Sequence, residues 1–183
     1  MRRALFVGID QSPNVPLRGC VSDATRIEAM LRQHHDGAPN FDTRLLIAPL
    51  GGPNTVVTRP ILRRHIEELF QHPADVALLF FAGHGTVNGL DGFLVTQDTA
   101  PHDEGVRLTD VLTLATNSPA REVIIMLDSC FSGNMGNPNG WGQALLREGI
   151  SILTASRGDQ VSVETAGGGL FTSLVIDALD GGA

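Results

Sequence analysis

Two segments that are apolar at nearly every position constrain the fold of this chain more than any other feature. They are Ala74–Ala82 and Glu122–Asp128. Consecutive apolar residues over the length of one strand indicate a strand that is buried on both faces, as in the centre of a parallel sheet covered by helices. The longest runs within them, Val76–Ala82 and Val123–Leu127, are far shorter than the roughly 18 residues that indicate a membrane span. The sequence therefore predicts an α/β fold and no membrane partner.

Strand-like and helix-like segments alternate along the rest of the chain, without an internal repeat or a low-complexity linker. We expect further strands at Ala4–Ile9, Thr43–Ala48 and Ile150–Ala155 and helices at Ser22–Gln33, Arg59–Gln71, Leu108–Thr116 and Leu170–Leu179. Ser22 is expected to cap the first helix, and Pro60 suits the first turn of the second, where a missing N–H costs least. Such alternation predicts three layers, with a mostly parallel sheet of about five strands between helices.

Charge and cysteine content exclude several classes of function. The chain has 183 residues, a net charge of −7 and 13 cationic side chains, all Arg and scattered along the chain. Nucleic acid is therefore not an expected partner, because its capture needs a basic surface. The amino terminus does not have the apolar core of a signal peptide. Two cysteines are too few for a disulfide scaffold, so we expect a cytoplasmic protein with reduced thiols.

An imidazole and a thiol directly follow the two most apolar strands. His84 comes two residues after Val76–Ala82, and Cys130 comes two residues after Asp128. Because the carboxyl ends of parallel strands meet at one edge of a sheet, we expect these side chains to lie close together. His84 would take the thiol proton and later protonate a leaving amine, while the N–H groups of Gly85 and Cys130 would stabilise an oxyanion. The alternative is that Cys130 is a small core residue.

Four segments, in this order, resemble the signatures of metacaspases and their bacterial relatives in the caspase clan. They are Leu-Phe-Val-Gly-Ile-Asp, Leu-Arg-Gly-Cys-Val-Ser-Asp-Ala, Phe-Phe-Ala-Gly-His-Gly and Leu-Asp-Ser-Cys-Phe-Ser-Gly. His84 and Cys130 are 46 residues apart, close to the roughly 50 typical of caspases. Gly-Leu-Phe-Thr at 169–172 resembles the start of the family's small-subunit helix.

The resemblance covers nearly the whole chain and implies its domain organisation. We expect one caspase-like catalytic domain over residues 1–183, with about 1–133 resembling the large subunit and about 149–183 the start of the small subunit. The family's sheet has six strands, and the chain stops where the family adds its last strand and a helix. We therefore expect a fragment of a larger protein that lacks the last strand of the sheet.

The resemblance also implies an activity, that of a cysteine endopeptidase acting through a Cys–His dyad and a thioester acyl-enzyme. In metacaspases acidic residues hold a substrate Arg or Lys, and the matching positions are Asp23 and Asp128, with Cys20 and Ala82 alongside. Two carboxylates in one pocket repel each other, and a guanidinium that pairs with both relieves that repulsion. Alternatively, Asp23 only favours a helix N-terminus and Asp128 only orients the loop that carries Cys130.

Other readings of the sequence stay open. Caspases hold a substrate Asp with an Arg before the glycine of this motif, and Arg18 precedes Gly19, so cleavage after acidic residues is one alternative. A non-catalytic signalling or scaffold domain of the same fold is another, and it needs neither His84 nor Cys130. A nucleotide-binding domain is a third, although no glycine fingerprint for phosphate follows the first strand.

No cofactor or metal is required by this chemistry, and the expected partners are a protein or peptide substrate and a regulatory domain or activator protein. Calcium activation stays open, because many metacaspases bind calcium through carboxylates after the catalytic His. The acidic residues in that region are Asp91, Asp98, Asp103, Glu104 and Asp110, and their spacing does not match a calcium loop. Arg147 is the only basic residue between Asp128 and Ile150, so it is the candidate for self-cleavage in a chain that we expect to stay intact.

Overall fold

The centre of the molecule is a five-stranded sheet in which every neighbouring pair of strands is parallel. The computed structural model describes residues 1–13, 15–53, 55–88, 91–129, 147–155, 164–165 and 168–182. The strands lie in the order β2 (Phe41–Ala48), β1 (Arg2–Ile9), β3 (Val76–Ala82), β7 (Glu122–Asp128) and β8 (Ile150–Thr154). The two most apolar strands, β3 and β7, are neighbours inside the sheet, as predicted.

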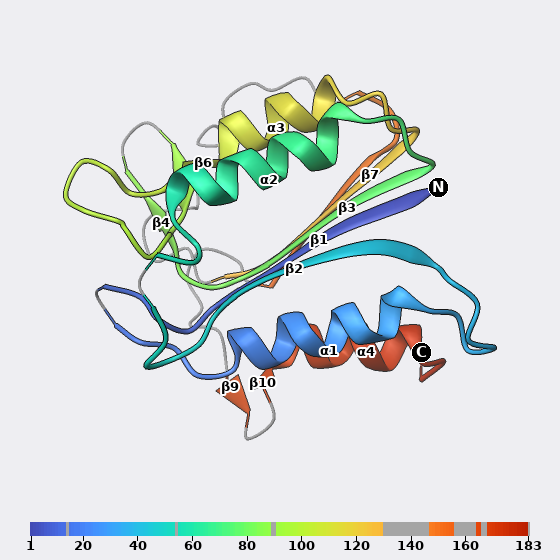
Figure 1. Ribbon diagram of the computed structural model, residues 1–183, viewed down its shortest axis with the longest axis horizontal. Coiled ribbons are helices and arrows are strands. Elements are labelled where there is room, and N and C mark those ends of the chain that lie inside the picture. The colour runs from blue at the N-terminus through green and yellow to red at the C-terminus, as the bar shows by residue number, and fades with distance from the viewer. Residues whose placement is uncertain are drawn as a thin grey trace.

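Helices cover both faces of the sheet and complete a three-layer α/β fold (Figure 1). On one face lie α1 (Cys20–Arg32) and α4 (Leu170–Leu179), and on the other lie α2 (Arg59–Gln71) and α3 (Leu108–Thr116). The expected strands and helices are all present within a few residues of their predicted bounds, which confirms the fold class. In the part of the chain that the structure describes, no helix is long and apolar enough to cross a membrane.

Alternate residues of β1 contribute to two separate hydrophobic cores. Leu5, Val7 and Ile9 pack in the core that lies under α2 and α3. Ala4 and Phe6 pack in the core on the side of α1 and α4. Successive side chains of a strand point to opposite faces, and burial of a large apolar side chain stabilises the fold by about 1.5–3 kcal/mol. A continuous apolar run is therefore what a strand between two helical layers requires.

Gly8 lets α1 approach β1 at backbone distance. A Cβ at this position would lie 2.5 Å from the carbonyl oxygen of Cys20 and 2.9 Å from the Cβ of Ala24. Both contacts are far inside van der Waals separation, so a larger residue would push the helix away from the sheet. The close contact places the first turn of α1, which contains Asp23, beside the carboxyl end of β1.

The start of α1 differs from the prediction. The helix begins at Cys20 after Gly19, whose φ of 124° is in the region that favours glycine, and no side chain of the helix caps it. Asp10, which follows β1, takes that role: its Oδ1 accepts hydrogen bonds from the N–H groups of Cys20 at 2.9 Å and Val21 at 3.5 Å. The prediction of Ser22 as the cap was wrong, because a carboxylate from a distant segment satisfies the first turn. Pro60 does lie in the first turn of α2, as expected.

Two small antiparallel sheets were not predicted. One consists of β4 (Gly85–Val87), β5 (Gly92–Leu94) and β6 (Val106–Arg107), and the other of β9 (Glu164–Thr165) and β10 (Gly168–Gly169). Strands of two or three residues are too short to show a period in the sequence. The first of these sheets begins directly after His84, and the second leads into α4.

Candidate active site

His84 follows the carboxyl end of β3, and its imidazole is held by a backbone carbonyl group. Its Nε2 lies 2.6 Å from the carbonyl oxygen of Val15. A carbonyl oxygen can only accept, so Nε2 carries a proton and donates it to this bond. In the neutral ring the lone pair is then on Nδ1, which is the atom able to accept a proton from another group.

The loop that carries Val15 is anchored at both sides. The N–H of Leu17 donates to the carbonyl oxygen of Asp10 at 2.9 Å, and the N–H of Gly51 donates to Oε1 of Gln11 at 3.0 Å. Sequence reasoning missed Val15 as the partner of His84. The interaction uses only its backbone oxygen, so no side-chain pattern could have indicated it.

Cys130 lies outside the described residues, but the strand that leads to it is well defined. Ala82 of β3 and Asp128 of β7 are register partners, and the N–H of Gly83 donates to the carbonyl oxygen of Asp128 at 3.3 Å. The chain is therefore paired up to two residues before His84 on one strand and two residues before Cys130 on the other. The prediction that the two strands are neighbours is confirmed, while the distance between imidazole and thiol stays a prediction.

Gly85 begins β4 immediately after His84. Its register partner is Leu94, and the carbonyl oxygen of His84 accepts a hydrogen bond from the N–H of Val95 at 3.0 Å. The backbone on both sides of the imidazole is thus fixed by the small antiparallel sheet. The oxyanion role of Gly85, which it would share with Cys130, stays a prediction.

The structure brings together the carboxylates of Asp23 and Asp128, which come from α1 and β7. A Cβ at Gly169 would lie 2.6 Å from Oδ2 of Asp128 and 3.1 Å from Oδ2 of Asp23. The two oxygens are therefore within about 6 Å of each other, close enough for like charges to interact. The two carboxylates lie close together, as predicted, and we call the two residues the acidic pair. That they line one substrate pocket beside Cys130 stays a prediction.

Each member of the acidic pair is hydrogen-bonded to the start of α4. Oδ2 of Asp23 accepts from the N–H of Gly169 at 2.7 Å, and Oδ2 of Asp128 accepts from the hydroxyl group of Thr172 at 2.5 Å. The sequence indicated a resemblance at 169–172 but no contact with the acidic pair. Neither alternative that the sequence left open for Asp23 and Asp128 includes this link to α4.

Burial makes the acidic pair costly to ionise. Asp23 is 3% exposed and Asp128 8%. Loss of solvation raises the pKa of Asp23 to about 6, although the N–H of Gly169 opposes this, and the nearby charge of Asp128 raises it further. Burial likewise raises the pKa of Asp128, against the effect of its bonds to Thr172. Among the described residues, the buried Oδ1 of Asp23 has no hydrogen-bond partner. It forms an ion pair with Nη1 of Arg26 at 3.5 Å.

The other residues predicted for the substrate pocket lie nearby. Cys20 is the half-buried first residue of α1, and Ala82 is the buried last residue of β3. Both pack in the core on the α1 side of the sheet. Arg18, the candidate for acidic specificity, is exposed just before α1. Their contact with substrate stays a prediction.

The acidic residues that follow His84 have partners of their own. Oδ1 of Asp98 accepts from the N–H of Arg59 at 2.8 Å and so caps α2, and Asp103 and Asp110 pair with Arg59 and Arg63. Asp91 is buried and accepts from the N–H of Gly92 at 2.8 Å. Within the described ranges no three His, Cys, Asp or Glu residues are grouped so that they could hold a metal ion. Calcium activation stays a prediction.

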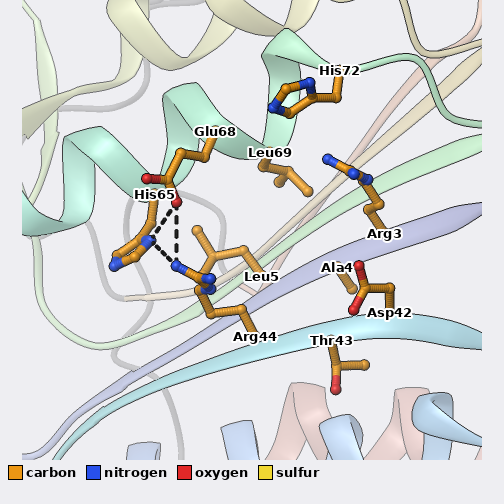
Figure 2. A pocket seen from close by; sticks show the side chains of 10 residues that line it. All are labelled: Arg3, Ala4, Leu5, Asp42, Thr43, Arg44, His65, Glu68, Leu69 and His72. Atoms are coloured by element: carbon orange, nitrogen blue, oxygen red, sulfur yellow. Dashed lines mark hydrogen bonds and ion pairs between the residues drawn. The ribbon is translucent and has the colours of Figure 1, made fainter.

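A cavity of about 300 Å³ lies away from these residues, between α2 and the strands β1 and β2 (Figure 2). Arg44, His65 and Glu68 meet on its wall, with Nη1 of Arg44 2.9 Å from Nδ1 of His65 and 3.2 Å from Oε2 of Glu68. The lining is of mixed charge and contains none of the residues predicted for the active site. We therefore place the candidate active site at the carboxyl edge of the sheet and not in this cavity.

The fold and the site together define a caspase-like α/β protein, with a parallel sheet that presents a histidine and a buried acidic pair at its carboxyl edge. A family model described as the caspase domain matches residues 1–183. The chain therefore belongs to the caspase-domain family, which supports cysteine peptidase activity in general. No curated protein matches the chain.

Proposed function

We propose that this protein is a metacaspase-like cysteine endopeptidase that cleaves peptide bonds after Arg or Lys. The observation that carries the proposal is the acidic pair, in which two buried carboxylates approach each other at the edge of the sheet that ends in His84. Burial of like charges is unfavourable unless a cation joins them. Arg26 of α1 is at an ion-pair distance from Asp23, and the guanidinium of a substrate Arg would add a second positive charge with paired donors that can reach both carboxylates.

The chemistry uses His84 and Cys130. Nδ1 of His84 takes the proton of the Cys130 thiol, and the thiolate attacks the carbonyl carbon of the substrate bond. The N–H groups of Gly85 and Cys130 stabilise the oxyanion, and His84 passes its proton to the leaving amine. The resulting thioester is hydrolysed by a water molecule that His84 deprotonates, which restores the thiol.

Two features of the described residues support this mechanism. The bond from Nε2 of His84 to Val15 leaves Nδ1 as the basic atom of the neutral ring. The register of Ala82 with Asp128 brings the ends of β3 and β7 side by side. Neighbouring strands are about 4.8 Å apart, which is the reason for proposing that His84 and Cys130, two residues beyond these ends, exchange a proton.

Specificity follows from charge and desolvation. A substrate Arg can pair with the carboxylates of both residues, whereas an apolar side chain would bring no charge to offset the repulsion between them. A Lys side chain carries the same charge but lacks the planar fork of donors, so we propose that Arg is the better substrate.

The proposal needs no cofactor, and the substrate is a protein or peptide. A regulatory domain or activator protein is the further partner that we propose, together with a cytoplasmic location that keeps Cys20 and Cys130 reduced. Neither nucleic acid nor a membrane has a place in the proposal.

A positional-scanning library of fluorogenic peptides tests the proposal. The wild type and Cys130→Ala are assayed with and without calcium. We expect cleavage after Arg and Lys by the wild type and none by the variant. Cleavage after Asp with Arg ignored would contradict the acidic pocket and favour Arg18, and turnover by Cys130→Ala would contradict the nucleophile. The comparison of wild-type activity with and without calcium decides whether the ion activates the enzyme.

A further inference from the structure

The start of α4 is bonded to both members of the acidic pair, although Asp23 and Gly169 are 146 residues apart in the chain. Gly169 precedes the helix and donates its N–H to Asp23, and Thr172 in the first turn donates its hydroxyl group to Asp128. Thr172 is fully buried, with 0% of its surface exposed. Contacts of this kind are maintained only when α4 keeps one position relative to α1 and β7.

The oxygens of the acidic pair that bond to α4 differ from the oxygen of Asp23 that lies near Arg26. Oδ2 of Asp23 and Oδ2 of Asp128 accept from α4. Oδ1 of Asp23 is buried and has no hydrogen-bond donor in the part of the chain that the structure describes, and it forms an ion pair with Nη1 of Arg26 at 3.5 Å. Ionised carboxylates have capacity for several donors each. Because α4 binds only Oδ2 of each carboxylate in these contacts, the acidic pair keeps acceptor capacity for the N–H groups of a cation.

We propose that Gly169 and Thr172 are specificity-positioning residues, which orient the acidic pair through the first turn of α4 so that it can receive the substrate cation. This inference rests on the proposed function, because it assigns the residues that prepare the same pocket. Neither residue needs to touch the substrate. They act through Asp23 and Asp128.

The physical basis of this role is the charge state and the direction of the carboxylates. Burial raises the pKa of both Asp23 and Asp128, while the donors of α4 lower it and so favour the ionised form. Asp10 beyond β1 also raises the pKa of Asp23, and Arg26 of α1 lowers it. Hydrogen bonds to the charged form keep a buried carboxylate ionised. Loss of the Thr172 hydroxyl group should therefore make Asp128 protonate at a higher pH.

Gly169 has a steric role that can be separated from backbone strain. Its φ of −66° and ψ of 137° are accessible to any residue. The methyl group of an alanine would nevertheless meet Oδ2 of Asp128 at 2.6 Å and Oδ2 of Asp23 at 3.1 Å. Gly169→Ala is thus expected to push the two carboxylates apart while the backbone keeps its conformation.

Thr172→Val and Thr172→Ser test the proposal. The valine variant keeps the shape of the side chain and removes the donor, and the serine variant keeps the donor. Thr113→Val is the matched control, since Thr113 is an exposed residue of α3 whose hydroxyl group donates to the carbonyl oxygen of Thr109 in the same helix. For each variant and the wild type, steady-state kinetics on Arg peptides and the melting temperature are measured from pH 5 to pH 8.

We expect Thr172→Val to lower kcat/KM for Arg peptides about tenfold, the effect of one lost hydrogen bond to a charged group. Most of this loss should come from a higher KM. The fall of kcat/KM on the acidic side of its pH profile should occur at a higher pH than in the wild type. Thr172→Ser and Thr113→Val should behave like the wild type, and Gly169→Ala should resemble Thr172→Val. Equal kinetics and an equal pH profile for Thr172→Val and the wild type would overturn the proposal.

A second measurement does not depend on catalysis. Titration of the Asp128 carboxyl carbon by NMR should give a higher pKa in Thr172→Val than in the wild type, and an unchanged pKa in Thr172→Ser. An unchanged pKa in the valine variant would contradict the positioning role even if the enzyme cleaves after Arg. If the wild type does not cleave after Arg but the pKa shifts as expected, the proposed function fails while the role of Thr172 in setting the charge of Asp128 stands.

Discussion

The N–H of Gly83 donates a hydrogen bond to the carbonyl oxygen of Asp128 at 3.3 Å, which joins the ends of the two central strands. His84 is the next residue after Gly83, and Asp128 precedes Cys130 by two positions. A backbone bond at this place prevents the two strand ends from separating. The imidazole and the acidic pair are thus attached to the same rigid edge, which is what a site with fixed geometry needs.

Cys130→Ala is expected to abolish peptidase activity with little change in melting temperature, because the proposed role of the thiol is chemical. Activity on Arg peptides and a thermal melt check this outcome. Cys20→Ser is the control, since Cys20 belongs to the pocket wall in our proposal and the variant should retain turnover. Unfolding of Cys130→Ala would instead favour a core role for this residue, and an inactive but folded Cys20→Ser would refute its assignment.

Removal of one charge from the acidic pair should depress kcat/KM for Arg peptides at least about tenfold, because a charged hydrogen-bonded pair loses about 2–5 kcal/mol when one partner is deleted. Asp23→Asn and Asp128→Asn remove only the charge and keep an acceptor for Gly169 and Thr172. The alanine variants should lose at least as much activity, and Asp128→Ala should also melt lower, since the buried hydroxyl group of Thr172 loses its acceptor.

Neither Asp23→Asn nor Asp128→Asn should convert the enzyme to cleavage after Asp. The measurement is the full specificity profile of each variant at equal enzyme concentration. Unchanged selectivity for Arg in both asparagine variants would show that the substrate cation binds elsewhere.

Asp23 should make the protein less stable as the pH rises from about 4 to about 6. Its pKa is raised to about 6 from the ordinary 3.8, so over this interval the folded chain holds a proton that the unfolded chain has lost. Asp23→Asn cannot titrate, and its free energy of unfolding relative to the wild type should increase across the interval by something on the order of 2 kcal/mol. Urea unfolding at pH 4 and pH 7 measures this difference, and a difference of the opposite sign would contradict the raised pKa.

Arg147 should not be cleaved by the enzyme. Its guanidinium donates to the carbonyl oxygens of Ala120 at 2.5 Å and Glu148 at 2.9 Å, with Ser118 and Arg121 each at 3.3 Å. These contacts hold the side chain near the start of β7, whereas Asp128 of the acidic pair is the last residue of this strand, about 20 Å away for a strand of seven residues. Mass spectrometry of active enzyme should show one intact chain, and two fragments that separate after Arg147 would contradict this. Arg147→Ala should lower stability by about 1–3 kcal/mol.

Gln11→Ala should reduce kcat with a smaller effect on KM. Oε1 of Gln11 accepts from the N–H of Gly51 and anchors the loop that carries Val15, the partner of His84. A looser loop holds Nε2 of His84 less firmly, so Nδ1 is less often in position to take a proton. Gln33→Ala, at the exposed end of α1, is the control. A change confined to KM would indicate that the loop contacts substrate and does not position the imidazole.

The sequence by itself determined the strands of the main sheet, the helices between them and the pairing of its two most apolar strands. Continuous apolar runs such as Val76–Ala82 can be satisfied only between two helical layers, and each run identified a strand without help from the rest of the chain. The positions of His84 and Asp128 at strand ends followed directly, because residues after parallel strands share one edge. The convergence of Asp23 with Asp128 could be expected for the same reason.

Only the tertiary structure decided how these groups are held. The carbonyl oxygen of Val15, the cap that Asp10 provides for α1 and the bonds of Gly169 and Thr172 to the acidic pair all join residues from separate segments. Such contacts depend on where loops and helix ends are placed once the sheet has formed. A backbone oxygen or a glycine N–H has no side-chain pattern along the chain, and the side chains of Asp10 and Thr172 meet their partners only because separate elements pack together.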